Sequence, residues 1–366
     1  MTIFVKMAPP MEDFARDKKG IKTRRTVITF VVLGVLFVAL FFAGILVGSS
    51  GMNSGESLGA LFGQGTGAAV RIVQQIRVPR LLAAIIAGAG LSISGLIMQS
   101  TLKNPMASPS TLGVSNAAVF GANLAIIGFA GGFLQTGNNP QNFALGANPY
   151  LTSSMAFLFA IISTLVVLAL CRIRAFSSET VVLAGIALGT VWTALTTLLQ
   201  FYATDVGLSA AVIWTFGDLG RATYETDWIM LAVVTVSTIV FLLLSWRYNA
   251  LSGGEDVARS LGVRVTWLRF ASLLLASLIT AVIVSYLGII GFVGIICPHA
   301  MKRILGHNHK VLIPSSLLAG AVLLLFSDLI SRLVGAGTVI PIGAVTALLG
   351  GPFFLYLIFA KKGAES

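Results

Sequence analysis

Long apolar stretches separated by short polar turns fill most of this chain. Residues 104–171 form a run of 68 residues without a single Asp, Glu, Lys or Arg. The core of a soluble domain cannot absorb so much uncharged chain, whereas two crossings of a hydrocarbon layer need about 20 apolar residues each. The pattern therefore predicts a protein that spans a membrane.

Ten membrane-spanning helices are predicted where about 20 residues pass without an unpaired charge and turns fall at Gly, Pro, Asn and charge clusters. The tightest pair is 265–286 and 289–305, because the uncharged run 270–301 has only 32 residues. Arg269 is then expected in a first helical turn, with its guanidinium extended toward the membrane surface. The predicted fold is all-α and polytopic. Its spans are 26–48, 80–101, 110–130, 151–171, 179–202, 228–246, 265–286, 289–305, 312–333 and 341–360.

Composition agrees with a single membrane domain. Hydrophobic residues make up 56% of the chain and charged residues 10%, far from the roughly 25% charge of soluble domains. Mean hydropathy is +0.94. The apolar run 26–48 is too long for the core of a signal peptide and predicts a retained first helix. We expect a basic N-terminal tail (1–25), one transmembrane domain (26–360) and a short C-terminal tail (361–366).

The positions of Lys and Arg predict the topology, since cytoplasmic segments are enriched in them. With the N-terminus inside, 19 of the 24 Lys and Arg residues fall on cytoplasmic segments and five fall outside. Both termini are then expected in the cytoplasm, and the lipid bilayer of the cell (cytoplasmic) membrane is the expected surroundings. This topology also accounts for the net charge of +11, so a nucleic-acid partner is not predicted.

Five arginines run against the positive-inside tendency. One interpretation is structural, with anchoring at the start of the second helix and an i, i+4 pair between Asp328 and Arg332. The other is an electropositive outer face that captures an acidic partner. The sequence leaves both open for these residues, Arg71, Arg77, Arg80, Arg221 and Arg332.

Small residues recur at every fourth position of the fifth predicted helix, at Gly185, Gly189 and Thr193. Such stripes let helix backbones approach closely in lipid. Packing is the expected role, and a pathway-lining role stays open. A shorter stripe in the second helix includes Gly88 and Ser92.

Metal and nucleotide chemistry find no support in the sequence. Cys171 and Cys297 match no metal-ligand spacing, and His307 and His309 have no carboxylate or thiolate beside them. No G-x-x-x-x-G-K-[ST] phosphate loop occurs. We therefore expect no cofactor, no metal site and no catalytic residue, and energy supplied by a partner.

Several motifs, in this order and spacing, resemble the permease subunits of iron-siderophore, haem and cobalamin ABC importers, the FecCD-type permeases. The resemblance covers about 77–360. It implies a type II ABC importer permease fold and a transport subunit that is not an enzyme. The implied partners are cytoplasmic ATP-binding subunits, an extracytoplasmic substrate-binding lipoprotein or periplasmic protein, and a second permease copy, as a homodimer or a paralogous heterodimer. The motifs are R-V-P-R-L-L-A-A (77–84), N-P-M-A-S-P-S-T-L-G-V-S (104–115), G-I-I-G-F-V-G-I-I-C-P-H (288–299), S-D-L-I-S-R (327–332) and P-I-G-A-V-T-A-L-L-G-G-P-F-F (341–354).

The resemblance also implies roles for individual residues. Arg77, Arg80 and Arg332 match positions that, in a vitamin B12-importing member, meet acidic residues of the binding protein. Ser178 and Glu179 match the cytoplasmic gate, where Glu179 replaces a small polar residue. The segment 255–262 matches a loop of two short helices that presses into the ATPase, which implies coupling roles for Glu255, Asp256, Arg259, Leu261 and Gly262.

Two other classes compete with this interpretation. A secondary transporter or channel needs ion-coupling groups at mid-membrane, but Glu179 and Asp328 are predicted near helix ends. An intramembrane enzyme needs a nucleophile and base pair or a metal-ligand cluster, and sequence spacing identifies neither. A ferric siderophore is the expected cargo, as the commonest in the family, with haem and cobalamin as alternatives.

Overall fold

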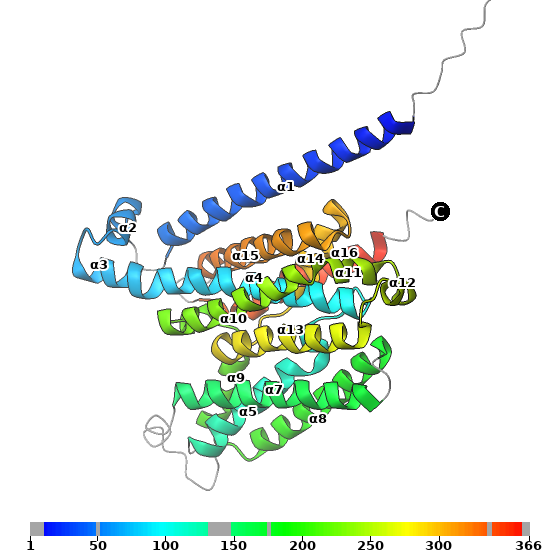
Figure 1. The fold of residues 1–366 in the computed structure, drawn as a ribbon. Helices are drawn as coiled ribbons and strands as arrows, with labels where there is room; N and C mark the ends of the chain where they lie inside the picture. Colours follow the sequence, from blue (N-terminus) through cyan, green and yellow to red (C-terminus); the bar gives the residue numbers. More distant parts are fainter. Residues whose placement is uncertain (1–10, 49–51, 131–147, 174–176, 335–338, 361–366) are drawn as a thin grey trace, which may run out of the picture.

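The computed structural model describes residues 11–48, 52–130, 148–173, 177–334 and 339–360, and within these the chain is nearly all helical. The long helices lie side by side in one bundle, and only α1 (Met11–Leu46) extends away from it at its N-terminal end (Figure 1). A single parallel bridge joins Phe216 to Ile289 in this part of the chain. The predicted all-α membrane fold is confirmed.

Seven helical segments of the described residues are long and apolar enough to cross a membrane. The second combines α3 (Gly67–Arg71), the π-helical η1 (Ile72–Arg77) and α4 (Val78–Thr101), so it begins well before the predicted residue 80. The others lie in α1, α7 (Pro149–Ile173), α8 (Ser178–Phe201), α10 (Tyr224–Leu243), α13 (Val265–Leu287) and α15 (His309–Val334).

Shorter helices complete the bundle. The predicted span 110–130 is divided into η2 (Pro109–Leu112), α5 (Val114–Asn123) and the π-helical η3 (Leu124–Phe129). The predicted span 289–305 begins only at α14 (Val293–Leu305), because Gly288 and Phe292 both have positive φ and break the helix before it. The last helix is α16 (Ile342–Ala360). The predicted C-terminal tail 361–366 and residues 1–10 lie outside the described residues.

Several short helices fall where the sequence predicted turns. At one end of the bundle, α2 (Ser54–Leu61) precedes α3, and α9 (Asp205–Thr215) with η5 (Leu219–Arg221) lies between α8 and α10. These segments are too short to cross a membrane, so a search for spans of about 20 residues passes over them. At the opposite end lie α11 (Ser245–Ser252) and α12 (Glu255–Ser260) (Figure 1).

Helix α4 is the centre of the bundle and packs against α10, α13, α14 and α15. Small residues make the closest approaches possible: a Cβ on Gly88 would overlap the carbonyl oxygen of Gly320, and one on Gly95 would overlap that of Gly294. The hydroxyl of Ser92 donates to the carbonyl of Ser316 at 2.7 Å. The stripe predicted in this helix therefore packs α4 onto α15, as expected for helices in lipid.

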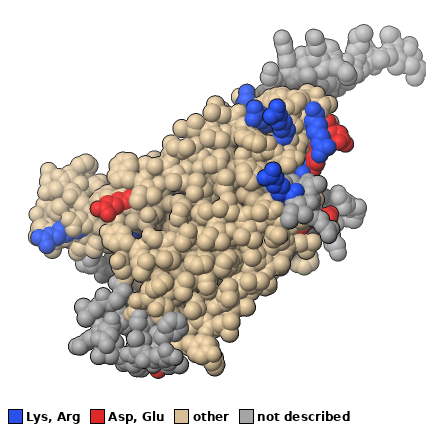
Figure 2. Space-filling model, turned by 60° about the horizontal axis from the view of Figure 1, so that its bottom comes forward, with Lys and Arg blue, Asp and Glu red and all other residues tan. Residues whose placement is uncertain are grey.

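Charged side chains separate to the two ends of the molecule. Figure 2 shows Lys and Arg gathered at one end of the visible face and a wide band without charged side chains beside them. A band of this kind fits the hydrocarbon layer, where an unpaired charge is costly. We refer to the end that carries α11 and α12 as the basic end. The opposite end carries α2, α3 and η5, and we call it the outer end because the sequence predicts that it faces outside.

Candidate docking, coupling and gate sites

At the outer end, one buried carboxylate joins two helices. Asp328 of α15 is fully buried, and its Oδ1 accepts from Nε of Arg80 on α4 at 2.6 Å. Its Oδ2 lies 2.6 Å from Nη2 of Arg332, one turn along the same helix. Asp218 at the start of η5 lies farther away, 3.7 Å from Nη1 of Arg80. The predicted i, i+4 pair of Asp328 and Arg332 is thus present, and the same carboxylate also holds Arg80.

Arg332 and Arg77 also hold the C-terminal end of α1. Nη1 of Arg332 donates to the carbonyls of Gly44 and Val47, both at 2.8 Å. Nη1 of Arg77 donates to the carbonyl of Ile45 at 2.5 Å. The last carbonyls of a helix have no partner within it, and its C-terminal end favours a cation. The guanidinium groups therefore cap α1 and fasten it to α4 and α15.

The structure supports the structural interpretation of these arginines, since Arg77 and Arg80 are buried. Arg77 is only 5% exposed and Arg80 only 7%, because their charges are used inside the protein. Among the described residues at the outer end, Arg71 is exposed, but so are Glu56 and Glu225. Docking by Arg77, Arg80 and Arg332 stays a prediction, and the surface above them is mixed in charge.

At the basic end, the predicted coupling segment 255–262 contains one short helix, α12, and a second short helix, α11, precedes it. The carboxylate of Glu255, the first residue of α12, forms an ion pair with Arg269 near the start of α13. Nε of Arg269 donates to the carbonyl of Thr101, the last residue of α4, at 3.1 Å. Arg269 is therefore buried and paired with a residue at the basic end, and its expected extension toward the membrane surface stays a prediction.

The pair has an electrostatic consequence for Glu255. The hydrogen bond from Arg269 holds the pKa of this carboxyl below its usual range, and the positive charges of Arg269, Lys103 and Arg259 act in the same direction. Arg259 lies one turn along α12, with Nη2 at 3.6 Å from the carboxylate. Glu255 therefore stays ionised at neutral pH and ties α12 to the bundle.

The opposite face of α12 is free of the bundle. Val257 and Leu261 are 47% and 52% exposed, whereas Ala258 between them is fully buried. Asp256 and Arg259 are also exposed. Gly262 follows with φ of +80°, a left-handed conformation that favours glycine. A short helix with an apolar tip, fastened at its base, can transmit a push from a partner to α4 and α13.

The predicted gate residues begin α8. Ser177 caps the helix, with its Oγ accepting from the amide of Thr180 at 3.1 Å. Ser178 and Glu179 then occupy the first turn, where Glu179 is exposed and its charge suits the positive end of the helix dipole. The structure thus gives Glu179 a local reason for its charge, and the gate role stays a prediction.

The glycine stripe of α8 faces its own chain. A Cβ on Gly185 would overlap the carbonyl oxygen of Thr111 in η2. The amide of Asn116 on α5 donates to the carbonyl of Gly189 at 3.1 Å and to the hydroxyl of Thr193 at 3.2 Å. These contacts support the packing interpretation for Gly185, Gly189 and Thr193. The pathway role stays a prediction.

A second face of α8 has no neighbour among the described residues. Several large apolar side chains there are more than half exposed, and α8 is one of the least buried of the long helices. Either lipid or a second protein can cover such a face. The residues are Leu183, Ile186, Val191 and Leu198.

A basic cavity of about 720 Å³ opens at the basic end between α4, α11, α14 and α15, and its lining includes Lys103 and Arg303. Lys302 donates to Oε1 of Gln99 at 3.0 Å. The imidazole of His309 forms hydrogen bonds with Ser100 and Asn249, so it joins α4, α11 and α15. No group of three His, Cys, Asp or Glu within the described ranges could hold a metal ion. Sequence spacing could not predict these contacts of His309, because the three residues belong to segments that are far apart in the chain.

Comparison with known proteins adds the evolutionary context. The model of the FecCD transport family matches residues 35–360. A protein named as an ABC transporter permease of Methanocaldococcus jannaschii is 43% identical over 347 residues, 94% of this chain and 98% of that protein. The vitamin B12 import system permease protein BtuC of Escherichia coli is 34% identical over 343 residues, 93% of this chain and 97% of BtuC.

A solved structure agrees with the sequence relatives. It is described as an inward-facing conformation of a metal-chelate type ABC transporter. The two folds superpose with a TM-score of 0.76 at 29% sequence identity, over 91% of this chain and 99% of the other.

Proposed function

The chain belongs to the FecCD transport family, and on that premise we propose that it imports a metal chelate, a ferric siderophore as first candidate, across the cytoplasmic membrane. It is a permease subunit and not itself an enzyme. The family implies ATP-binding subunits, a substrate-binding protein and a second permease copy. The specific contacts proposed below give each of these partners a place on the described surface.

The proposed contact with the ATPase is the exposed tip of α12. The observation that carries this proposal is the connection from Glu255 through Arg269 to the last carbonyl of α4. These two polar contacts couple a displacement of α12 directly to the central helix α4. ATP-driven closure of the partner subunits would then shift the permease between two arrangements.

The proposed contact with the second permease copy is the exposed apolar face of α8. A pathway between two copies places the first turn of α8, with Ser178 and Glu179, at its cytoplasmic mouth. Gly185, Gly189 and Thr193 would hold the helix to its own subunit from the other side through η2 and α5. A homodimer and a paralogous heterodimer both satisfy this arrangement.

The proposed contact with the binding protein is the outer end. Arg77, Arg80 and Arg332 lie directly beneath this surface and hold α1, α4 and α15 together. Their contribution to docking is then chiefly to fix the shape of the surface. We propose that both termini and the basic end lie in the cytoplasm, because cytoplasmic segments are enriched in Lys and Arg. A cysteine at Arg221 should react with an impermeant thiol reagent in intact cells, and one at Gly254 should not; the reverse pattern would overturn this orientation.

Cobalamin is the second candidate cargo, and the 34% identity to BtuC over 93% of this chain favours it. Both candidates are metal ions enclosed in a large organic chelator. The deciding experiment reconstitutes the permease with its ATPase and binding protein in liposomes and measures ATP-dependent uptake of a radiolabelled ferric siderophore and of radiolabelled cobalamin. Uptake of the siderophore alone supports the proposal, and uptake of cobalamin alone replaces it with the second candidate.

A further inference from the structure

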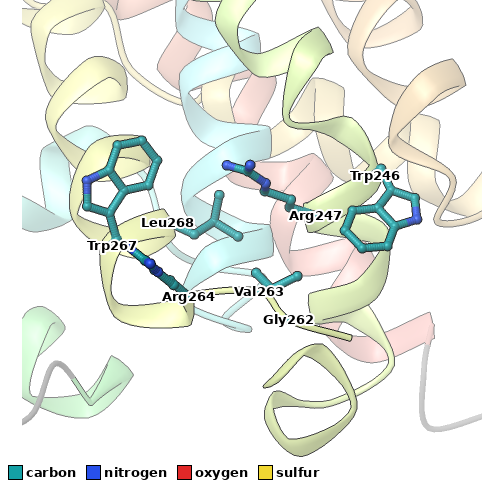
Figure 3. A pocket seen from close by; sticks show the side chains of 7 residues that line it. All are labelled: Trp246, Arg247, Gly262, Val263, Arg264, Trp267 and Leu268. Atoms are coloured by element: carbon teal, nitrogen blue, oxygen red, sulfur yellow. The ribbon is translucent and has the colours of Figure 1, made fainter. Parts of the chain in front are cut away.

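A separate cavity of about 370 Å³ lies at the basic end between α11 and the start of α13 (Figure 3). It has no assigned role in the coupling or gate sites above, although Gly262 at the end of α12 forms part of its wall. Its lining combines two tryptophans, two arginines and a short backbone turn. The residues are Trp246, Arg247, Gly262, Val263, Arg264, Trp267 and Leu268.

The charge of this cavity is positive and uncompensated. Arg247 projects from α11, and Arg264 is the residue directly before α13 (Figure 3). Both side chains are exposed, and within the described residues neither forms an ion pair with a carboxylate. Two unpaired guanidinium groups at one cavity favour an anion with several acceptor oxygens.

The start of α13 adds to this preference. Arg264 is its N-cap residue, no side chain caps the helix, and its first turn contains no acidic residue. Trp267 and Leu268 of this first turn line the cavity, so the uncapped end of a 23-residue helix opens onto it. Backbone amides and the helix dipole at such an end attract phosphate groups.

The tryptophans place the cavity at the membrane surface. Trp246 and Trp267 are 52% and 56% exposed, and Leu243, at the end of the apolar α10, is exposed just before them in the chain. Tryptophan is enriched where the hydrocarbon layer meets the headgroups. The cavity therefore opens at the depth of lipid phosphates, with an apolar helix surface leading into it.

We propose that this cavity binds the headgroup phosphate of an anionic phospholipid, held by Arg247, Arg264 and the start of α13 and flanked by Trp246 and Trp267. The lipid binding goes beyond import itself and rests only on the bilayer placement of the chain, whereas its effect on coupling rests on the proposed function. Because Gly262 and Val263 join α12 to α13, a bound headgroup fixes the connection between the coupling segment and α13. The lipid composition of the membrane then influences the coupling of ATP hydrolysis to transport.

The test uses the full-length permease in nanodiscs and measures quenching of tryptophan fluorescence by brominated lipid. Brominated phosphatidylglycerol is compared with brominated phosphatidylcholine at equal mole fraction. The signal of the two cavity tryptophans is isolated by subtracting the variant with Trp246→Phe and Trp267→Phe. We expect phosphatidylglycerol to quench this signal more strongly than phosphatidylcholine.

Matched variants assign the preference to the two arginines. Replacing both with glutamine should weaken the preference for phosphatidylglycerol about tenfold or more, since each basic side chain near an anionic surface contributes substantially to lipid attraction. Replacing both arginines with lysine should keep most of the preference for phosphatidylglycerol. That result would show that the site still folds in the variants. The control variant, Arg172→Gln with Lys310→Gln, removes the same charge from exposed positions outside the cavity and should keep the full preference.

Four results would overturn the proposal. They are equal quenching by the two lipids, an equal loss in the control variant, displacement of the lipid by inorganic phosphate, which would indicate a site for free anions, and loss of the preference when the ATPase subunits bind, which would indicate a protein contact. The readout needs neither cargo nor ATP, so its failure is distinct from a failure of the proposed import function.

Discussion

Asp328 accepts a hydrogen bond from Arg80 at 2.6 Å across 248 residues of sequence. This bond joins α15 to α4 at the outer end. The carboxylate of Asp328 also neutralises Arg332. A buried charge that loses its partner is strongly destabilising, because the low-polarity surroundings cannot solvate it. The stability of the outer end therefore depends on this single carboxylate.

Replacing Asp328 with Asn should lower the stability of the purified permease by about 3–5 kcal/mol. The buried guanidinium of Arg332 loses its counter-ion, and that of Arg80 keeps only the more distant Asp218. The melting temperature in detergent is the measurement. Asp205→Asn is the matched control, because Asp205 is exposed at the same end and should change little. Equal melting temperatures for the two variants would show that Asp328 has no such role.

Reversing Arg77 and Arg80 together to Glu should weaken docking of the binding protein, because carboxylates would then face Asp328 and the carbonyls that end α1. Affinity is measured across a salt series on the fraction that stays folded. If Arg77 and Arg80 contact the partner directly, the loss should be largest at low salt, where screening is slight. If they only support the surface, the loss should be independent of salt.

Arg71→Glu is the control for this experiment, since Arg71 is exposed and outside the buried cluster. A folded Arg77/Arg80 reversal with the affinity and the salt slope of the unmodified protein would remove both residues from the docking site.

The sequence predicted the long spans well because hydropathy integrated over about 20 residues is a strong signal. It could not predict that Arg80 is buried, since its counter-ion Asp328 is distant in the chain and only the folded bundle brings them together. The positive-inside tendency assigns a residue to a side of the membrane and says nothing of its exposure. The burial of Arg269 could not be predicted for the same reason. The resemblance assigns its partner Glu255 to the coupling segment and gives no sign that the two residues pair.

The sequence did not predict helix α9 or the break before α14, for a different reason. Asp205–Thr215 is an apolar helix too short to span a membrane, so it was absorbed into a predicted turn. The irregular stretch before α14 depends on positive φ at Gly288 and Phe292. Positive φ is expected at glycine but unusual for phenylalanine, so a helical pattern gives no warning of it.

Glu255→Gln should uncouple ATP hydrolysis from uptake, because it breaks the link from α12 to Arg269 and α4. Stability should also fall, because the buried guanidinium of Arg269 loses its carboxylate partner. The ratio of cargo imported to ATP hydrolysed is the measurement. Glu225→Gln, at an exposed carboxylate of the outer end, should leave the ratio unchanged.

The pH dependence of this pair has a definite sign. Because the pKa of Glu255 is lowered in the folded protein, its stabilisation is fully present above the ordinary Glu pKa. It is lost as pH falls through the lowered pKa. The difference in melting temperature between the unmodified protein and Glu255→Gln should therefore be constant from about pH 5 to 8 and disappear in stronger acid. A difference that disappears near neutral pH would contradict the ion pair.

Gly262→Ala should destabilise the turn after α12 by about 1–2 kcal/mol, because an L-residue with a Cβ is strained in the left-handed region. Nothing lies within 4 Å of the added Cβ, so any effect comes from the backbone and not from a clash. Gly253→Ala is the matched control, since Gly253 has φ of −77° in the turn before α12. Lower uptake per ATP in the first variant alone is expected, and equal behaviour would exclude a role for the conformation of Gly262.

The central claim is that this chain moves its cargo with energy delivered by a partner through α12. The most direct measurement is uptake into proteoliposomes that contain the permease and cargo-loaded binding protein, with and without the ATPase subunits. We predict uptake only when the ATPase and ATP are both present, no response to an imposed proton or sodium gradient, and loss of uptake in Glu255→Gln despite continued ATP hydrolysis. Uptake driven by an ion gradient without the ATPase would contradict the account and identify a secondary transporter.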